Sequence, residues 1–373
     1  MNIIVVGPYP PFRGGIADLN YALVKNLSRK HVVNVINFTT QYPSLLFPGK
    51  TQYKPDFKPS KFESERLVSS INPWSWKRTA DRILDQSPDF VIFRYWMPFF
   101  AIALGNIAKK IKGISDIPIL AICDNIIPHE RRLFDTFLTR YFLTKVDRFI
   151  VLSKSVERDL IYLNPSAIYR YSPHPIYNIF GDALDKMEAR QKLGISSEKV
   201  ILYFGLIREY KGLDILINAA GELKNHLENF KVLVVGECYE NPEKYENLVK
   251  QNNVENIVEL KLEFVPDEEV ASYFSAADVV ALPYRSATQS GIVQIAYHFN
   301  RPVIVSNVGG LPEIVPDGEV GYVVEPIPIE FSRAIQEFYE YEKEVEFSAN
   351  IVTYKKRFSW DNMINTIEEL IAE

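Results

Sequence analysis

Residues 200–212 read VILYFGLIREYKG, and this stretch decides the fold of the second half of the chain. It begins with five apolar residues without polar alternation, which indicates a strand buried on both faces, as in a parallel sheet. Glycines and cations follow, and then a helical pattern, which is typical of a turn at the carboxyl edge of such a sheet. The run MNIIVVG at residues 1–7 opens the first half in the same way, ahead of the turn PYPPFRGG at 8–15.

Short apolar strands alternate with helical patterns in both halves of the 373 residues. This alternation predicts two α/β domains with doubly wound, Rossmann-like parallel sheets. We expect an N-terminal domain at 1–175, a linker at 176–196, a C-terminal domain at 197–356 and a terminal helix at 357–373 that crosses back to the first domain. Residues 169–181 mark the break because they show no periodicity. The two domains are expected to face each other across a cleft at their strand ends.

One segment, residues 39–75, does not fit this alternation. It is rich in Pro, Phe, Tyr and Lys and contains no clear element beyond a short turn near Glu63–Ser69. Loops of this length are usually functional or disordered. Its aromatic residues favour an ordered segment, which leaves two interpretations open: a packed surface insertion or a flap that binds an acceptor.

Composition excludes several classes of protein. The net charge of −5 and the pI near 5.7 argue against nucleic-acid binding. No signal peptide or apolar run of about 20 residues is present, so we expect a cytoplasmic protein. Basic side chains on the first-domain helices are either an ordinary solvated surface or a peripheral contact with the inner face of a membrane. They are Lys109, Lys110, Lys112, Arg131, Arg132 and Arg140.

Candidate anion-binding residues follow the first and fourth strands of the second domain. Arg208 and Lys211 stand at the end of the first strand and supply the charge that a diphosphate needs. The stretch PYRSATQSGIVQ at 283–294 leads from the fourth strand into a helix, and its hydroxyls and backbone N–H groups near Gly291 form a neutral anion cradle. No DxD-like cluster lies beside it, so no metal is predicted.

In the first domain, Gly14 and Gly15 expose backbone N–H groups at a helix start, which suits a phosphate or merely permits a sharp turn. The turn is not GxGxxG, so a dinucleotide site is not expected.

Several runs carry a family resemblance. They are FGLIREYKG (204–212), VLVVGE (232–237), FVPDEEVASYFSAADVVALPY (264–284) and RPVIVSNVGGLPEIVPDGEVGYVV (301–324). In this order they resemble the donor domain of family 4 glycosyltransferases, which have the GT-B fold. Residues 7–23 resemble the glycine-rich acceptor-side loop of the same family.

The resemblance implies roles for particular residues. The catalytic candidates are His129, near the transferred sugar, and Asp124. The implied donor-binding residues are Gly14, Gly15, Arg208, Lys211, Glu237, Thr288, Gln289, Ser290, Gly291 and Gln294. The chain also departs from the family, because Ala287 and Ile295 stand where members usually carry two glutamates. Gln289, Gln294 or Ser290 would then serve as neutral partners, in an atypical subgroup.

The implied function is a retaining glycosyltransferase without a metal or other cofactor. The donor would be a nucleotide diphosphate sugar, and the acceptor a glycan, free or lipid-linked, in surface polysaccharide or lipopolysaccharide biosynthesis. Two alternatives stay open: a non-catalytic scaffold that binds nucleotide sugars, and a GT-B nucleotide-sugar epimerase.

Overall fold

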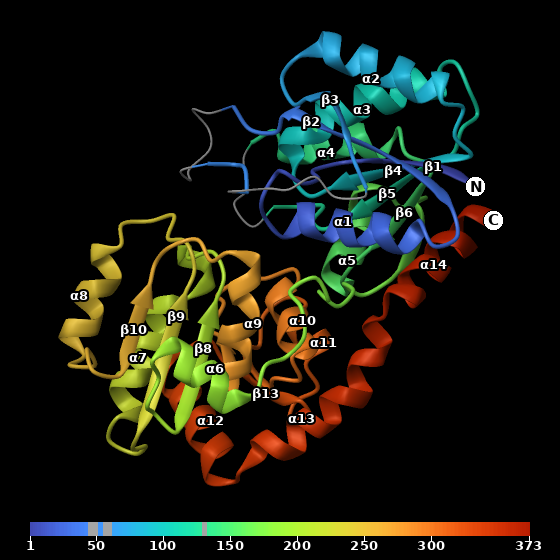
Figure 1. The fold of residues 1–373 in the computed structure, drawn as a ribbon. Coiled ribbons are helices and arrows are strands. Elements are labelled where there is room, and N and C mark those ends of the chain that lie inside the picture. The colour runs from blue at the N-terminus through green and yellow to red at the C-terminus, as the bar shows by residue number, and fades with distance from the viewer. Residues whose placement is uncertain (44–50, 55–61, 129–132) are drawn as a thin grey trace. The chain divides into compact units, whose positions relative to one another are not determined.

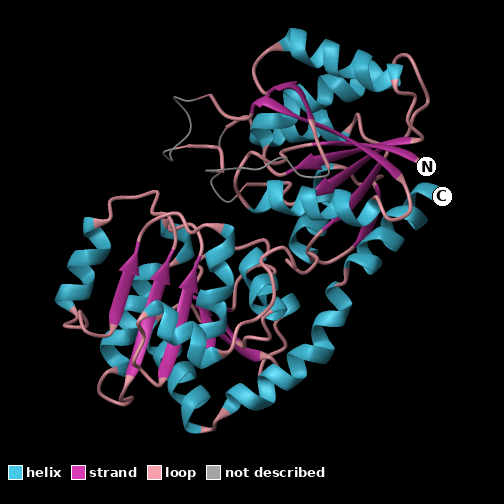
Figure 2. Ribbon diagram, in the orientation of Figure 1, coloured by secondary structure: helices cyan, strands magenta, loops and turns pink. Residues whose placement is uncertain are grey.

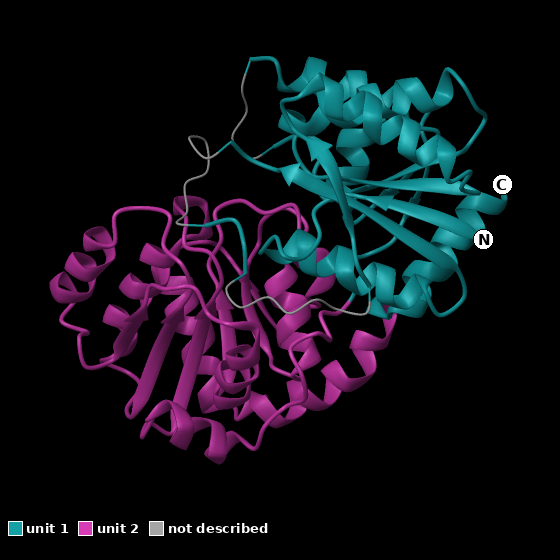
Figure 3. Ribbon diagram, turned by 45° about the horizontal axis from the view of Figure 1, so that its top comes forward, with its two compact units in different colours: residues 1–175, 358–373 teal, residues 176–357 magenta. Residues whose placement is uncertain are grey.

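The computed structural model describes residues 1–43, 51–54, 62–128 and 133–373. These residues form two compact units (Figure 3). Unit 1 comprises Met1–Pro175 and Phe358–Glu373, and unit 2 comprises Ile176–Arg357. The chain therefore passes from unit 1 to unit 2 and returns to unit 1 for its last helix.

Unit 1 is built on a parallel sheet whose described strands number seven, in the order β3-β2-β1-β4-β5-β6-β7 (Figures 1 and 2). The strands are β1 (Asn2–Val6), β2 (Val32–Thr40), β3 (Glu65–Ser69), β4 (Phe90–Tyr95), β5 (Ile119–Cys123), β6 (Arg148–Val151) and β7 (Ile168–Tyr171). The central strands β4 and β5 are buried at every residue, as their continuous apolar runs predict. Strand order reverses between β1 and β4, which makes their carboxyl ends the switch point of the sheet.

Helices cover both faces of the unit 1 sheet (Figure 1). They are α1 (Gly15–Leu27), α2 (Pro73–Asp85), α3 (Ala101–Lys112, preceded by a 3₁₀ turn at Pro98–Phe100), α4 (Asp135–Leu143), α5 (Lys154–Leu163) and α14 (Trp360–Ala372). Helices α2, α3 and α4 pack in sequence on one face, and α1 and α14 pack together on the other. Helix α14 buries an apolar stripe at helical spacing, and its Glu368 accepts hydrogen bonds from Lys30 and contacts His31 Nε2 at 2.8 Å.

Unit 2 repeats the plan with a parallel sheet of six described strands in the order β10-β9-β8-β11-β12-β13. Its strands are β8 (Lys199–Phe204), β9 (Phe230–Val235), β10 (Val258–Lys261), β11 (Val279–Leu282), β12 (Val303–Ser306) and β13 (Gly321–Val324). Its helices are α6 (Lys186–Leu193), α7 (Leu213–Leu223), α8 (Glu243–Gln251), α9 (Asp267–Ala276), α10 (Gly291–His298), α11 (Leu311–Ile314), α12 (Pro328–Glu340) and α13 (Lys343–Tyr354), with 3₁₀ turns at Glu209–Lys211 and Lys355–Phe358. The switch point lies between β8 and β11. The two doubly wound sheets confirm the predicted fold class.

Several elements were not predicted. Strand β3 and the start of α2 lie inside the segment 39–75, and β7 begins at Ile168, next to the predicted break. Helix α6 lies within the predicted linker 176–196 and packs against α9, so those residues are an integral part of unit 2 rather than a linker. Its sequence KMEARQKL is polar, which hides the helix from a search for apolar periodicity. Asp185 caps it by accepting hydrogen bonds from the backbone N–H groups of Met187 and Glu188.

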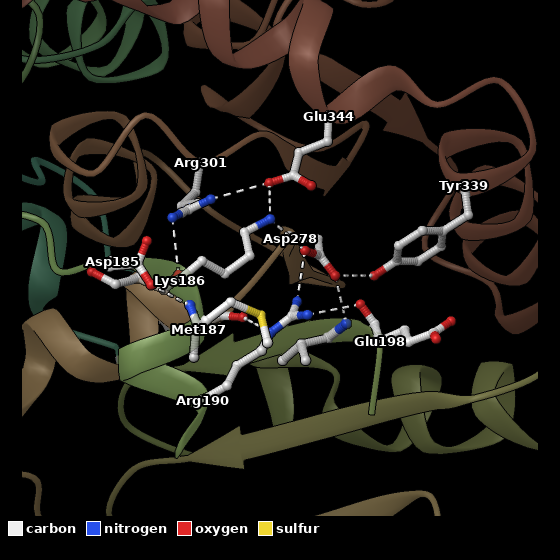
Figure 4. A network of polar contacts seen from close by, with 12 residues as sticks. Asp185, Lys186, Met187, Arg190, Glu198, Asp278, Arg301, Tyr339 and Glu344 are labelled. Atoms are coloured by element: carbon white, nitrogen blue, oxygen red, sulfur yellow. Dashed lines mark hydrogen bonds and ion pairs between the residues drawn. The ribbon is translucent and has the colours of Figure 1, made fainter. Parts of the chain in front are cut away.

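A buried polar network anchors α6 to the rest of unit 2 (Figure 4). At its centre is Asp278, 3% exposed, which directly precedes β11. Its carboxylate accepts hydrogen bonds from Lys186 Nζ and Arg190 of α6, each at 2.7 Å, from Val200 N at 2.7 Å, and from Tyr339 Oη of α12 at 3.2 Å. One carboxylate thus ties two helices to the amino end of the central strands.

Candidate functional site

The loops that follow β8 and β11 in unit 2 are held against each other. Arg285 N donates to Tyr210 O at 2.7 Å, and the Arg285 guanidinium binds both carboxylate oxygens of Asp214 at 2.8 and 2.5 Å. Gly212 has a φ of +64°, and a Cβ there would lie 1.9 Å from Pro283 O, so only glycine fits. These contacts fix the loop after β8 and the loop after β11 relative to each other at the switch point of the sheet.

Lys211 lies beside the first turn of α10. Its Nζ donates to Tyr284 Oη at 3.2 Å, and Tyr284 lies on the loop that leads through Ser290 into α10. A Cβ built on Gly205 would lie 3.7 Å from Lys211 Nζ and 3.1 Å from Ile292 Cδ1. Burial lowers the pKa of Lys211, and the charge of Arg208 lowers it further. A desolvated cation and the positive end of a helix thus meet at one point, as an anion requires.

Arg208 and Glu237 border the same point. The Arg208 guanidinium lies over the ring of Tyr239, 5.2 Å from its centroid. Ile207 N donates to the Glu237 carbonyl at 2.9 Å, and Tyr239 N donates back to Ile207 O at 3.1 Å, so the ends of β8 and β9 are joined. The structure therefore gathers the predicted cations and Glu237 at one edge of the unit 2 sheet.

The loop from Thr288 to Gln294 combines polar side chains with low exposure. Thr288 and Ser290 are buried, and Gly291 packs under Tyr177, whose ring would lie 3.0 Å from a Cβ at Gly291. Gln294 is fully buried on the first turn of α10, and among the described residues neither of its amide atoms has a hydrogen-bond partner. The first turn of α10 thus holds an amide whose donor and acceptor atoms are both available to a ligand.

The positions of the two missing glutamates are apolar and closely packed. Ala287 is 6% exposed and Ile295 is 5% exposed. The Ala287 carbonyl accepts a hydrogen bond from Gly310 N and would lie 1.5 Å from a Cβ at Gly309. No carboxylate stands at either position, so any polar contact there has to come from neighbouring residues.

Sequence reasoning missed three residues of this site: Tyr177, Tyr284 and Arg285. Tyr284 and Arg285 lie in the stretch 283–294, and their aromatic and cationic side chains are typical of a binding loop. The sequence does not indicate, however, that they contact the loop after β8. Tyr177 lies about 110 positions before Gly291 in the sequence, and no pattern links the two.

In unit 1, the glycine-rich turn before α1 is bound by residues 51–54. Gly14 has a φ of +111°, and its carbonyl accepts from the first N–H groups of α1. Arg13 N donates to Gln52 O at 2.9 Å and Lys54 N donates to Pro11 O at 2.8 Å, while Lys54 Nζ forms a 2.6 Å ion pair with Asp18. This part of the segment 39–75 is therefore packed against the turn that carries Gly14 and Gly15.

The chain matches the family model for glycosyl transferases group 1 over residues 185–358, which lie almost wholly in unit 2. A relative named D-inositol 3-phosphate glycosyltransferase, from Corynebacterium aurimucosum, is 26% identical over 78% of this chain and 73% of its own length. An uncharacterized glycosyltransferase of Methanocaldococcus jannaschii is 29% identical over the whole of this chain and 98% of its own.

Solved structures extend the likeness to both units. Sucrose-phosphate synthase from Thermosynechococcus elongatus has a TM-score of 0.78 at 18% identity, covering 99% of this chain and 98% of its own. Anabaena HepE in complex with UDP has a TM-score of 0.74 at 18% identity over both full chains, and its complex with UDP-glucose scores 0.71 at 19% identity over 99% of each. WaaG, a glycosyltransferase involved in lipopolysaccharide biosynthesis, scores 0.68 at 17% identity over 95% of each chain. This chain is a GT-B glycosyltransferase of the family 4-like type.

The predicted catalytic residues of the glycosyltransferase lie in unit 1. Asp124 directly follows β5, is 5% exposed, and accepts hydrogen bonds from Arg94 Nε and Nη2 at 2.6 Å each. This bidentate pair engages both carboxylate oxygens, so the geometry favours an orienting role for Asp124 over proton transfer. His129 lies outside the described residues.

The glycosyltransferase has a buried histidine, His174, near the Asp124–Arg94 pair at the end of unit 1. Its Nδ1 lies 2.9 Å from Pro175 O, and burial lowers its pKa to about 4. The unfolded chain binds a proton near pH 6.5, so the folded state loses stability as the pH falls from 6.5 towards 4. We expect a loss of about 2 kcal/mol from this residue between pH 7 and pH 5.

Urea unfolding of wild type and His174→Gln at both pH values measures this. The variant is expected to lose about 2 kcal/mol less than the wild type on acidification. Equal losses in the two proteins would show that His174 titrates normally in the folded state.

Within the described part of the chain, no cluster of three or more His, Cys, Asp or Glu side chains is arranged to hold a metal ion. No helix of that part has the length and apolar content needed to span a bilayer.

Proposed function

We propose that this glycosyltransferase moves a sugar from a nucleotide diphosphate sugar to a hydroxyl of a glycan, with retention of the anomeric configuration and without a metal ion. The acceptor is a surface polysaccharide or lipopolysaccharide precursor, lipid-linked, at the inner face of the membrane. The observation that carries the proposal is the position of Lys211, whose Nζ donates to Tyr284 Oη on the loop before α10 and lies, like Ile292 of the first turn of α10, within 4 Å of a Cβ built on Gly205.

The chemistry breaks the bond between the anomeric carbon and the donor phosphate oxygen, and it forms a bond to the acceptor hydroxyl. Negative charge develops on the departing diphosphate, and the hydroxyl proton leaves with it. Lys211, Arg208 and the N–H groups at the start of α10 are groups that stabilise such charge without moving. Because these donors are fixed by the paired loops, little reorganisation is needed during the reaction.

Two comparisons support the details. HepE structures hold UDP and UDP-glucose, which favours a uridine diphosphate sugar as the first donor to test. The likeness to WaaG favours a lipopolysaccharide-type acceptor.

A second candidate function is a binder of nucleotide sugars without turnover. The apolar side chains of Ala287 and Ile295 favour it, because they leave two positions near α10 without a carboxylate.

Thermal shift with UDP, ADP, GDP and their sugars tests donor binding, and product release under the same conditions tests turnover. A donor at 100 times its Kd is expected to add about 2.7 kcal/mol of stability. We expect binding and nucleotide release to persist in EDTA. Binding without release in any acceptor panel supports the second candidate, whereas activity that EDTA abolishes and Mg²⁺ restores contradicts metal independence.

A further inference from the structure

An exposed apolar turn marks the start of α4 in unit 1. Leu133 is 97% exposed, Phe134 71% and Phe137 73%. Phe142 and Leu143 on α4 are fully buried, so the helix is firmly packed; Leu133 and Phe134 lie in the turn just before it, and Phe137 lies in its first turn. Scattered exposed hydrophobic residues are ordinary, but three large ones within the five positions 133–137 form a patch of the kind that marks an interaction surface.

The charges near this patch are mainly positive. Arg140 lies exposed one turn after Phe137, and Lys145 follows the helix with its Nζ 5.8 Å from the centroid of the Tyr141 ring. Asp135 is the one acidic residue between 133 and 145, and it is half-buried. Most of the other basic residues that the sequence suggested as a membrane contact do not add to this charge. Lys110 pairs with Asp81, and Lys112 pairs with Asp147. Arg131 and Arg132 lie outside the described residues.

The patch lies close to the carboxyl edge of the unit 1 sheet. Helix α4 follows β5 and the loop that begins with Asp124, and α1 with its glycine turn starts from the same edge after β1. A membrane bound at this patch would therefore lie near the glycine-rich turn, which resembles the acceptor-side loop of the family.

We propose that Leu133, Phe134 and Phe137 insert into the interface of an anionic lipid bilayer, with Arg140 on the headgroups. The proposal rests on the proposed function, since it supplies the contact through which a lipid-linked acceptor would reach the enzyme. A short apolar turn flanked by cations is the pattern of an interfacial anchor. A stable dimer needs about 800 Å² per partner, and one turn with two aromatic side chains offers considerably less.

Sedimentation with vesicles tests the proposal without donor or acceptor. The wild type is expected to bind vesicles that contain phosphatidylglycerol and to bind pure phosphatidylcholine more weakly. Replacing Leu133, Phe134 and Phe137 by serine is expected to weaken binding at least about tenfold, because each buried apolar side chain contributes more than 1 kcal/mol. Arg140→Gln is expected to weaken binding to the anionic vesicles about fivefold and to leave binding to neutral vesicles unchanged.

A matched control replaces three other exposed apolar residues of unit 1 by serine: Trp74, Ile114 and Tyr162, which are 80%, 65% and 72% exposed. They are not contiguous, so this variant is expected to bind vesicles like the wild type. Equal loss in both triple variants, or none in either, overturns the proposal. A second result would also overturn it. The wild type would not bind vesicles but would be a dimer by light scattering, and serine at Leu133, Phe134 and Phe137 would make it a monomer.

Donor binding by thermal shift separates this inference from the proposed function. The serine variant of the patch is expected to keep the wild-type shift with the donor, because unit 2 holds the diphosphate cradle. If the wild type does not bind vesicles but still turns over the donor, the membrane contact is wrong and the proposed function is unaffected.

Discussion

Replacing Lys211 by methionine is expected to lower kcat by a factor of about 10²–10³, the usual effect of removing one fixed group that stabilises a charged transition state. The melting temperature is expected not to fall. Burial lowers the pKa of Lys211, so the folded state disfavours its charged form and gains no stability from it at neutral pH. A buried ammonium group that does not stabilise the fold is explained if it binds a negatively charged ligand. Steady-state kinetics and calorimetry on the same preparations measure both quantities.

Lys244 provides the matched control. It is also a lysine of unit 2 whose Nζ lies over a tyrosine, 5.3 Å from the centroid of Tyr245, but it pairs with Glu240 at 3.4 Å and lies on α8. Lys244→Met is expected to leave kcat unchanged. A Lys211→Met enzyme with wild-type kcat, or one that loses activity only because its melting temperature collapses, would remove Lys211 from the diphosphate site.

Much of the fold was predictable because the central strands are continuous apolar runs. Strands β4, β5, β8 and β11 are buried on both faces, and burial of this kind leaves a direct mark on the sequence. Elements at the periphery leave a weaker mark. The edge strand β7 alternates between exposed and half-buried residues, and α6 is held by Asp278 through Lys186 and Arg190 rather than by an apolar face.

The candidate site was predictable where local order determines it. Lys211 follows β8 within seven positions, and the loop before α10 follows β11, so the topology of a parallel sheet brings both to one edge. Contacts between loops were not predictable, because they depend on how two turns pack. The bond from Lys211 to Tyr284 and the cover of Gly291 by Tyr177 belong to this class. The Arg94 partner of Asp124 was missed for the same reason, since it comes from a neighbouring strand.

Asp278 is expected to matter for stability as much as Lys211 matters for turnover. Asp278→Asn leaves Arg190, which is 7% exposed, and Lys186 without their shared carboxylate oxygen (Figure 4). Breaking one partner of a buried ion pair costs about 3–5 kcal/mol, since the remaining charge stays buried. For a unit of this size the cost corresponds to a fall of roughly 10 °C in the melting temperature. Calorimetry of the variant measures it.

The same variant is expected to keep the wild-type kcat at temperatures where it is folded. Asp278 precedes β11, whereas the loop that carries Tyr284 and Ser290 follows it, so the two lie at opposite ends of one strand. Glu344→Gln is the control at the exposed end of the network: Glu344 is 30% exposed in its side chain, and its loss is expected to cost less than about 1 kcal/mol. If the fully folded Asp278→Asn enzyme had a lower kcat and Glu344→Gln did not, the network would be coupled through β11 to the loop before α10. The prediction that Asp278 affects stability but not kcat would then be wrong.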